Sequence, residues 1–295
     1  MSYDSSHRSS QAGDQAGTEQ RMIICELKDR DFQCISSFVY ERYRINLHAG
    51  KKMLVQHRLN KRLRELGISD FRTYWEYLQE YGEEVVAMVD CLTTNHTKFF
   101  REPDHFDCLR KRVFPLLRER EEGGIRIWSA GCSSGEEAYS LAIVLCEAIE
   151  DVENRDALIL ATDISQRMLE RARGGVYSKS SIADIPPDLR MKYFDPVDVE
   201  RNGELMFKVS RNLCDMVRFR TLNLAGQWPM KRKFDVILCR NVMIYFDHDT
   251  QKELVDRFWN ILKHGGVFIV GHCESLMGKM GKFKYQEPTV YVKRD

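Results

Sequence analysis

The chain has 295 residues, of which 43% are hydrophobic and 30% are charged, and its formal net charge is +1. This length suggests one large domain or two smaller ones, and the near-neutral charge excludes a globally basic nucleic-acid binder. Because no apolar run approaches the roughly 18 residues of a membrane span and the 9 cysteines lack metal-ligand spacing, we expect a cytoplasmic protein with reduced thiols, no metal and no membrane insertion.

The first part of the chain changes character near residue 22. Residues 1–21 are polar and without periodicity, which predicts a disordered tail. Over residues 22–92 apolar side chains recur at helical spacing, as at Val55, Leu59 and Leu63, and Asp70 is placed to cap a further helix. The pattern predicts a small all-helical N-terminal domain.

The predicted helix near residues 51–66 carries an unusual charge. Glu65 is its only acid, whereas its bases include Lys51, Arg58, Lys61 and Arg62. One interpretation is a solvated basic face. The other is a docking surface for an acidic partner, either a carboxylate-rich helix or nucleic acid phosphate.

Residues 93–111 separate this helical region from the C-terminal part of the chain. Their first part concentrates hydroxyl and amide side chains and then an arginine, at Thr93, Thr94, Asn95, Thr97 and Arg101. Such a run is a poor helix interior but a suitable polar lining for a site. An interdomain linker and a contribution to the active site are both compatible with these residue types.

From residue 112 to 295, strand and helix patterns alternate, which predicts βαβ units and a parallel sheet. The expected strands span 125–130, 157–163, 234–239 and 267–270, and the capping box at Thr250 and Glu253 predicts the start of a helix that ends near His264. Short alternating strands near 205–209 and 216–220 predict an antiparallel insertion over about 176–222. The expected fold class is α/β, a doubly wound, Rossmann-like domain that follows the helical domain.

In such sheets ligands lie at the carboxyl ends of the strands. This rule places a site at residues 131–137, Asp163, residues 222–224 and residues 240–241. Asp163, ending the second strand, suits a ribose, whereas Glu136 and Glu137 at a helix start would repel a diphosphate and favour a cationic ligand. S-adenosylmethionine combines a ribose, a sulfonium and an ammonium group without phosphate.

Three motifs together make the chain resemble a known family. They are residues 93–102 (TTNHTKFFRE), 135–140 (GEEAYS) and 239–246 (CRNVMIYF). From about residue 25 to the C-terminus, the chain resembles the CheR family of chemotaxis receptor glutamate O-methyltransferases. The residues at 130–132, Ala-Gly-Cys, depart from the alanine run of other members.

The resemblance implies the cofactor, the acceptor and the site residues. S-adenosylmethionine would donate a methyl group to glutamate side chains on the cytoplasmic helices of methyl-accepting chemotaxis receptors. The implied active-centre residues are Arg101 and Tyr245, and the implied cofactor contacts are Asn95, Thr97, Arg101, Glu137, Asp163, Asn223, Leu224, Arg240 and Asn241.

The resemblance also implies how partners bind. The basic helix would dock the receptor through Lys51, Arg58, Lys61 and Arg62, and the 176–222 insertion would hold a receptor C-terminal peptide in some members. It implies recruitment to receptor arrays in the bacterial cytoplasm, with no nucleic acid partner. We also expect a monomer, because nothing in the sequence demands a larger assembly. Two alternatives stay open, namely a class I methyltransferase acting on RNA or a small molecule, and a non-catalytic module that senses S-adenosylmethionine.

Overall fold

The computed structural model describes residues 25–120, 123–201, 203–276 and 283–294. The predicted tail at residues 1–21 lies outside this range. Within it, no helix combines the length and the apolar character that crossing a membrane requires.

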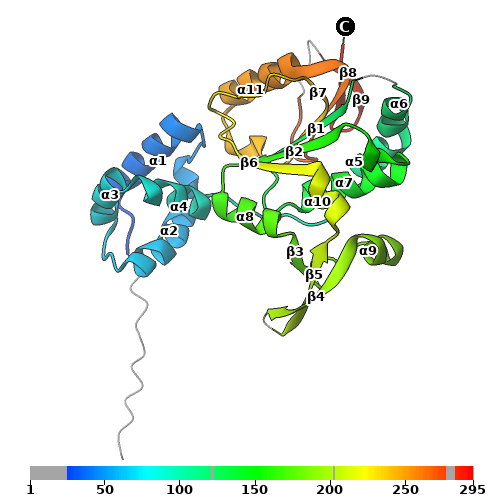
Figure 1. The fold of residues 1–295 in the computed structure, drawn as a ribbon. Helices are drawn as coiled ribbons and strands as arrows, with labels where there is room; N and C mark the ends of the chain where they lie inside the picture. Colours follow the sequence, from blue (N-terminus) through cyan, green and yellow to red (C-terminus); the bar gives the residue numbers. More distant parts are fainter. Residues whose placement is uncertain (1–24, 121–122, 202, 277–282, 295) are drawn as a thin grey trace, which may run out of the picture.

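The N-terminal region is helical, as the sequence predicts (Figure 1). It consists of α1 (Asp29–Tyr43), a short 3-10 turn (Ala49–Lys51), α2 (Lys52–Leu66), α3 (Phe71–Glu80) and α4 (Gly82–Leu92). Asp70 caps α3 by accepting a hydrogen bond from the Thr73 N–H at 2.9 Å, and Gly67 ends α2 in the left-handed conformation. The apolar faces of these helices form a core that continues into the next domain.

The second region contains a 7-stranded sheet in the order β6-β2-β1-β7-β8-β10-β9. Its strands are β1 (Ile125–Ala130), β2 (Ala157–Asp163), β6 (Val217–Thr221), β7 (Phe234–Cys239), β8 (Leu262–Val270), β9 (Phe283–Glu287) and β10 (Val290–Lys293). The strands from β6 to β8 are parallel, and β10 is antiparallel to both β8 and β9. The predicted Rossmann-like fold class is confirmed.

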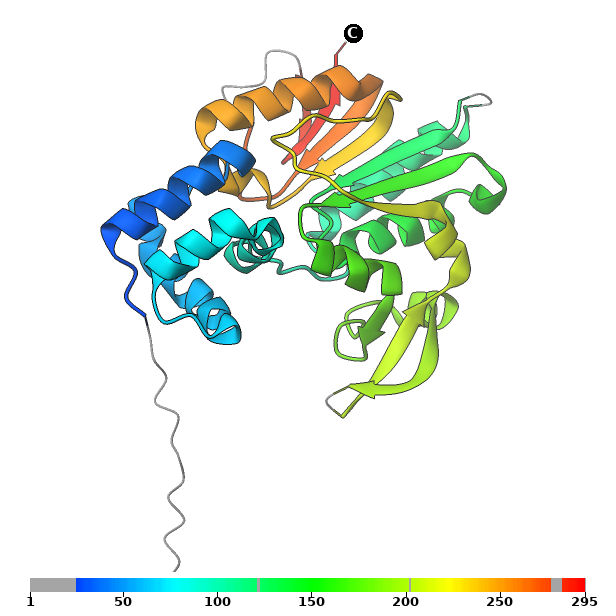
Figure 2. The same ribbon diagram turned by 60° about the vertical axis from the view of Figure 1, so that its left-hand side comes forward.

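Both faces of the sheet are covered (Figure 2). The helices are α5 (Pro103–Cys108), a π-helical stretch (Leu109–Val113), α6 (Phe114–Arg118), α7 (Glu136–Ala148), a 3-10 turn (Val152–Asn154), α8 (Gln166–Gly174), α10 (Arg211–Met216), a 3-10 turn (Met243–Tyr245) and α11 (His248–Ile261). Alternate residues of β1 face opposite cores, Ile127 with α7 and Trp128 with α11 and the N-terminal helices. This double burial explains why β1 is buried along its whole length.

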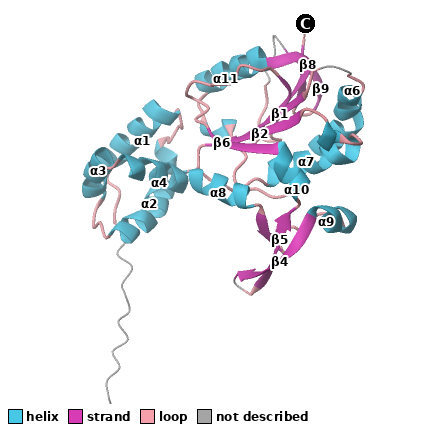
Figure 3. Ribbon diagram, viewed as in Figure 1, coloured by secondary structure: helices cyan, strands magenta, loops and turns pink. Residues whose placement is uncertain are grey.

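The antiparallel insertion is present, but it is shorter than predicted. It contains β3 (Val176–Ser178), α9 (Pro187–Tyr193), β4 (Phe194–Arg201) and β5 (Glu204–Val209), in the sheet order β3-β5-β4, and it projects from the main sheet (Figure 3). The predicted strand at 216–220 does not belong to it. That segment is β6, which pairs in parallel with β2 at the edge of the large sheet.

A second correction concerns α11. Its N-cap is Asp247, whose carboxylate accepts a hydrogen bond from the Thr250 N–H at 2.8 Å, so the capping box predicted at Thr250 lies inside the helix. The helix ends at Ile261, before the predicted stop near His264, because β8 already begins at Leu262.

Candidate active site

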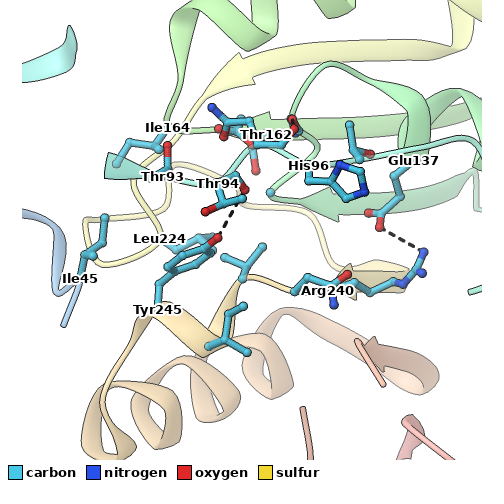
Figure 4. Close-up of a pocket in the computed structure, with 18 of the residues that line it drawn as sticks. Ile45, Thr93, Thr94, His96, Glu137, Thr162, Ile164, Leu224, Arg240 and Tyr245 are labelled. Carbon is cyan, nitrogen blue, oxygen red and sulfur yellow. Dashed lines mark hydrogen bonds and ion pairs between the residues drawn. The ribbon is translucent and has the colours of Figure 1, made fainter. Parts of the chain in front are cut away.

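A cavity of ≈ 470 Å³ lies where the N-terminal helices meet the carboxyl ends of β1, β2, β6 and β7 (Figure 4). It brings together all of the residues predicted to contact the cofactor or to form the active centre, from segments far apart in the chain. These are Asn95, Thr97, Arg101, Glu137, Asp163, Asn223, Leu224, Arg240, Asn241 and Tyr245.

The turn after β1 passes close to the loop after β7. Gly131 has φ +96°, and a Cβ there would lie 2.3 Å from Cγ2 of Val242. The backbone N–H groups of Gly131 and Cys132 both donate to the Thr162 carbonyl, at 2.7 and 2.9 Å. Glycine is therefore required both by the backbone angle and by the close approach.

Asp163 fixes the far side of this turn. Its Oδ2 accepts from the Ser133 N–H at 2.8 Å, and its Oδ1 accepts from the Ser165 N–H at 2.9 Å. Burial raises the pKa of the Asp163 carboxyl, while these backbone donors oppose the rise. The carboxylate still lines the cavity, and a carboxylate oxygen has a second lone pair for a ligand hydroxyl.

Glu137, at the start of α7, belongs to a buried charge network. Its Oε1 accepts from the Ser129 hydroxyl at 2.6 Å, and its Oε2 lies 3.3 Å from Nη1 of Arg240. The same guanidinium pairs with Glu102 at 3.0 Å and has only 1% of its side chain exposed. Burial raises the pKa of Glu137, and the charge of Arg240 opposes this rise.

The neighbouring Glu136 does not share this role. Its carboxylate accepts from the Ser134 hydroxyl at 2.8 Å, and it is not among the residues that line the cavity. Of the two glutamates that the sequence predicted to face a ligand, only Glu137 lines the cavity.

The loop after β7 is shaped by a residue that the sequence reasoning missed. Oε2 of Glu274 accepts from the backbone N–H groups of Asn241 at 2.8 Å and Gly271 at 2.7 Å, and this buried carboxylate also faces the Ile244 N–H at 3.3 Å. Asn241 has φ +58°. Glu274 shortly follows β8, so the strand-end rule that identified Asp163 could also have found it.

The run at residues 93–102 forms one wall of the cavity. The Ser133 hydroxyl donates to the Asn95 carbonyl at 3.1 Å, and the Tyr245 hydroxyl donates to the Thr94 carbonyl at 3.3 Å (Figure 4). Arg101 donates to the carbonyl of His96 at 2.8 Å. This run is thus built into the site and is not a free linker.

The N-terminal helices close the cavity. Nδ2 of Asn223 donates to the Arg42 carbonyl at 2.8 Å, and the Asn46 N–H donates to the Tyr245 carbonyl at 2.8 Å. Tyr43 and Ile45 consequently line the site. No sequence signal marked them, because their placement depends on how the two domains meet.

The basic residues of α2 and of the 3-10 turn before it have different environments. Arg58 donates to the Leu92 carbonyl and to the Thr94 hydroxyl, at 2.5 and 2.6 Å, and Arg62 forms two hydrogen bonds to Glu84. Lys51 donates to the Asn46 carbonyl at 3.2 Å. Among the four residues predicted to dock a receptor, Lys61 is the one that is exposed.

This sheet order, with the carboxylate of Asp163 at the end of β2, is that of the class I methyltransferase fold. Residues 95–292 match the family model described as CheR methyltransferase, SAM binding domain, and residues 30–93 match its all-alpha domain. The chain therefore belongs to the CheR methyltransferase family, and the predicted resemblance is confirmed.

Curated relatives agree with this assignment. A probable chemotaxis protein methyltransferase of Rhizobium etli is 41% identical over 82% of this chain and 91% of its own. The chemotaxis protein methyltransferases of Borreliella burgdorferi and Escherichia coli are 40% and 38% identical, over 86% and 90% of this chain and 91% of their own length in each case.

Proposed function

We propose that this protein transfers a methyl group from S-adenosylmethionine to glutamate side chains of chemotaxis receptors, forming methyl esters in the bacterial cytoplasm. The observation that carries the proposal is the convergence in one cavity of Asp163 and Glu137 with the 93–102 run and the loop after β7. The names of the relatives, chemotaxis protein methyltransferases, supply the acceptor class.

The residues of the cavity fit the donor. Asp163 offers oxygens for ribose hydroxyls, and Glu137 offers a carboxylate for an ammonium group. Leu222, Leu224 and Ile164 add apolar surface for an adenine ring. When bound, the donor supplies an electrophilic methyl group on a positively charged sulfur.

The residues of this chain then have to orient an acceptor that is already reactive. A glutamate with a pKa near 4.3 is ionised at neutral pH, so no general base is needed. We assign Arg101 to orienting a carboxylate by charge-assisted hydrogen bonds, and Tyr245 to hydrogen bonding close to the reacting centre. Donor and acceptor together would displace water from the cavity, which would strengthen these contacts.

Receptor docking is proposed for the exposed stripe of α2, defined as Met53, His57, Lys61 and Arg64, which recur at spacings of four, four and three. This revises the docking set that the sequence suggested, because Arg58 and Arg62 are bonded within the chain. A receptor C-terminal peptide at the β3-β5-β4 sheet, a monomeric state and the absence of a nucleic acid partner remain parts of the proposal.

The test is incubation of the full-length protein with methyl-labelled S-adenosylmethionine and membranes that contain chemotaxis receptors. Base-labile label on the receptor is expected, and it should disappear when the acceptor glutamates are replaced by alanine. Label in added RNA, or tight donor binding with no transfer to any acceptor, would overturn the proposal in favour of an RNA methyltransferase or a sensor.

A further inference from the structure

A second cluster of polar side chains contains Glu102, which also pairs with Arg240 of the methyl-donor cavity. Carboxylate and imidazole atoms of Glu102, His105 and His272 lie within 4.8 Å of one another. Glu102 and His105 are three residues apart at the start of α5, whereas His272 follows Gly271 at the end of β8. The fold therefore assembles this group from distant segments, which is why spacing along the sequence gave no metal signal.

The protonation of His105 can be assigned from its neighbours. Its Nε2 lies 2.7 Å from the Thr289 hydroxyl, and that hydroxyl donates its one proton to the Pro288 carbonyl at 2.6 Å. The hydroxyl is then an acceptor, so Nε2 carries the proton and Nδ1 presents a lone pair.

This lone pair lies in an unfavourable place. Nδ1 of His105 is 3.4 Å from Oε2 of Glu102, and it has no hydrogen-bond partner among the residues that the structure describes. His105 is 1% exposed. A buried lone pair that faces a carboxylate oxygen costs free energy unless a cation lies between them.

We propose that Glu102, His105 and His272 form a binding site for a divalent transition metal ion, with Zn²⁺ as the best-suited ion. Two imidazoles and one carboxylate are a common zinc ligand set that leaves further positions for water. Tetrahedral ligands at roughly 2.1 Å from a metal lie about 3.4 Å apart, which equals the separation of Nδ1 and Oε2.

The remaining features suit such a site. His272 is exposed and lines, with His105, a cavity of ≈ 350 Å³ that gives an ion access from solvent. The Nε2–H of His105 has its hydrogen bond to Thr289, as metal-bound histidines usually require of their other nitrogen. Glu102 also pairs with Arg240 at 3.0 Å. An ion bound to Glu102 would therefore be in direct contact with the charge network of the methyl-donor cavity.

The test is titration of the EDTA-treated full-length protein with Zn²⁺ in competition with a chromophoric chelator, followed by thermal unfolding with and without Zn²⁺. Wild type and the control variant His57→Gln, on the exposed face of α2, are expected to bind one ion at this site and to unfold at higher temperature with Zn²⁺. His272→Gln changes an exposed residue and is compatible with folding. His272→Gln and His105→Gln should each weaken binding by more than the roughly 10- to 100-fold that follows loss of a hydrogen bond to a metal ligand.

Cys273, beside His272, provides a further control because thiols also bind zinc. Cys273→Ser should keep the site. The proposal is overturned if wild type binds no Zn²⁺ at micromolar concentration, if His272→Gln binds it as tightly as wild type, or if Cys273→Ser alone removes binding. No methyl donor or receptor enters the titration, so its failure would leave the proposed function untouched.

Discussion

The methyl-donor cavity and helix α2 both carry several charges, but they use them in opposite ways. In the cavity, Arg240 is 1% exposed on its side chain and pairs with Glu102 and Glu137, which are each 13% exposed. On α2, Arg62 is bonded to a buried glutamate, whereas Lys61, one residue earlier, faces solvent. These three charged residues are thus largely buried and paired with one another. The charged residues of α2 are partly paired within the chain and partly exposed to solvent.

Arg58 joins the two regions. Arg58 reaches from α2 to the Leu92 carbonyl and the Thr94 hydroxyl, and Thr94 in turn accepts at its carbonyl from Tyr245. A helix that is proposed to dock the receptor therefore holds a wall of the site directly. A basic residue on α2 must therefore be tested individually before it is given a docking role.

The largest effect is expected from Arg240→Ala. It leaves Glu102 and Glu137 buried without a cation, and breaking a buried pair costs about 3–5 kcal/mol. We expect a loss of that size in the free energy of unfolding by urea, together with loss of S-adenosylmethionine binding by calorimetry. The control Arg240→Lys keeps the positive charge but loses the planar guanidinium that bonds both glutamates. Its free energy of unfolding and its donor affinity should lie between those of wild type and Arg240→Ala. Unchanged donor affinity in Arg240→Ala would contradict the proposed cavity.

Next in size is Arg62→Ala, which tests the interior part of α2. It leaves the Glu84 carboxylate, 4% exposed, with the Tyr74 hydroxyl but without its cation. Since Arg62 itself is partly exposed, we expect a destabilisation of roughly 2–4 kcal/mol, measured by urea unfolding, with the KM for receptor unchanged below the transition. Arg64→Ala, an exposed neighbour, is the control for stability. An Arg62→Ala variant of normal stability and raised KM would make Arg62 a docking residue after all.

The predictability of these features differs for physical reasons. Strand ends are defined by local patterns, so Asp163 and Arg240 could be placed in one site from topology alone. The partners of those residues could not be predicted in this way, because they are distant in the sequence. Glu102, for example, bonds Arg240 across 138 positions. The position of Tyr43 in the cavity and the Glu102–His105–His272 cluster could not be predicted from the sequence for the same reason.

The errors in the fold occur where the local sequence is compatible with two structures. The alternating pattern of β6 is the same whether a strand pairs with the insertion or with the edge of the large sheet, so residues 216–220 were assigned to the wrong sheet. At α11, both Asp247 and Thr250 are good caps, and Asp247 takes the role while Thr250 is buried in the first turn. Such choices depend on tertiary packing rather than on propensity.

A smaller effect is expected from the proposed active-centre residues, because each makes few contacts within the chain. Loss of a charged hydrogen bond in Arg101→Ala should lower kcat/KM for receptor methylation about 10- to 100-fold, and Tyr245→Phe about tenfold. The rates are measured with labelled donor, with the unfolding midpoint as control for the fold. Wild-type rates in both variants would remove these residues from the active centre.

The smallest effect is expected on the solvent-facing part of α2. Exposed ion pairs contribute about 0.2–1 kcal/mol each, so Lys61→Ala combined with Arg64→Ala should raise the KM for receptor several-fold and leave kcat and stability unchanged. Because these contacts are screened, the KM of wild type should also rise with salt, and the variant should respond less. Lys252→Ala, an exposed base on α11, is the matched control. If the double variant and Lys252→Ala behave alike at every salt concentration, the exposed stripe of α2 does not dock the receptor, and the division of charge on this helix serves the fold alone.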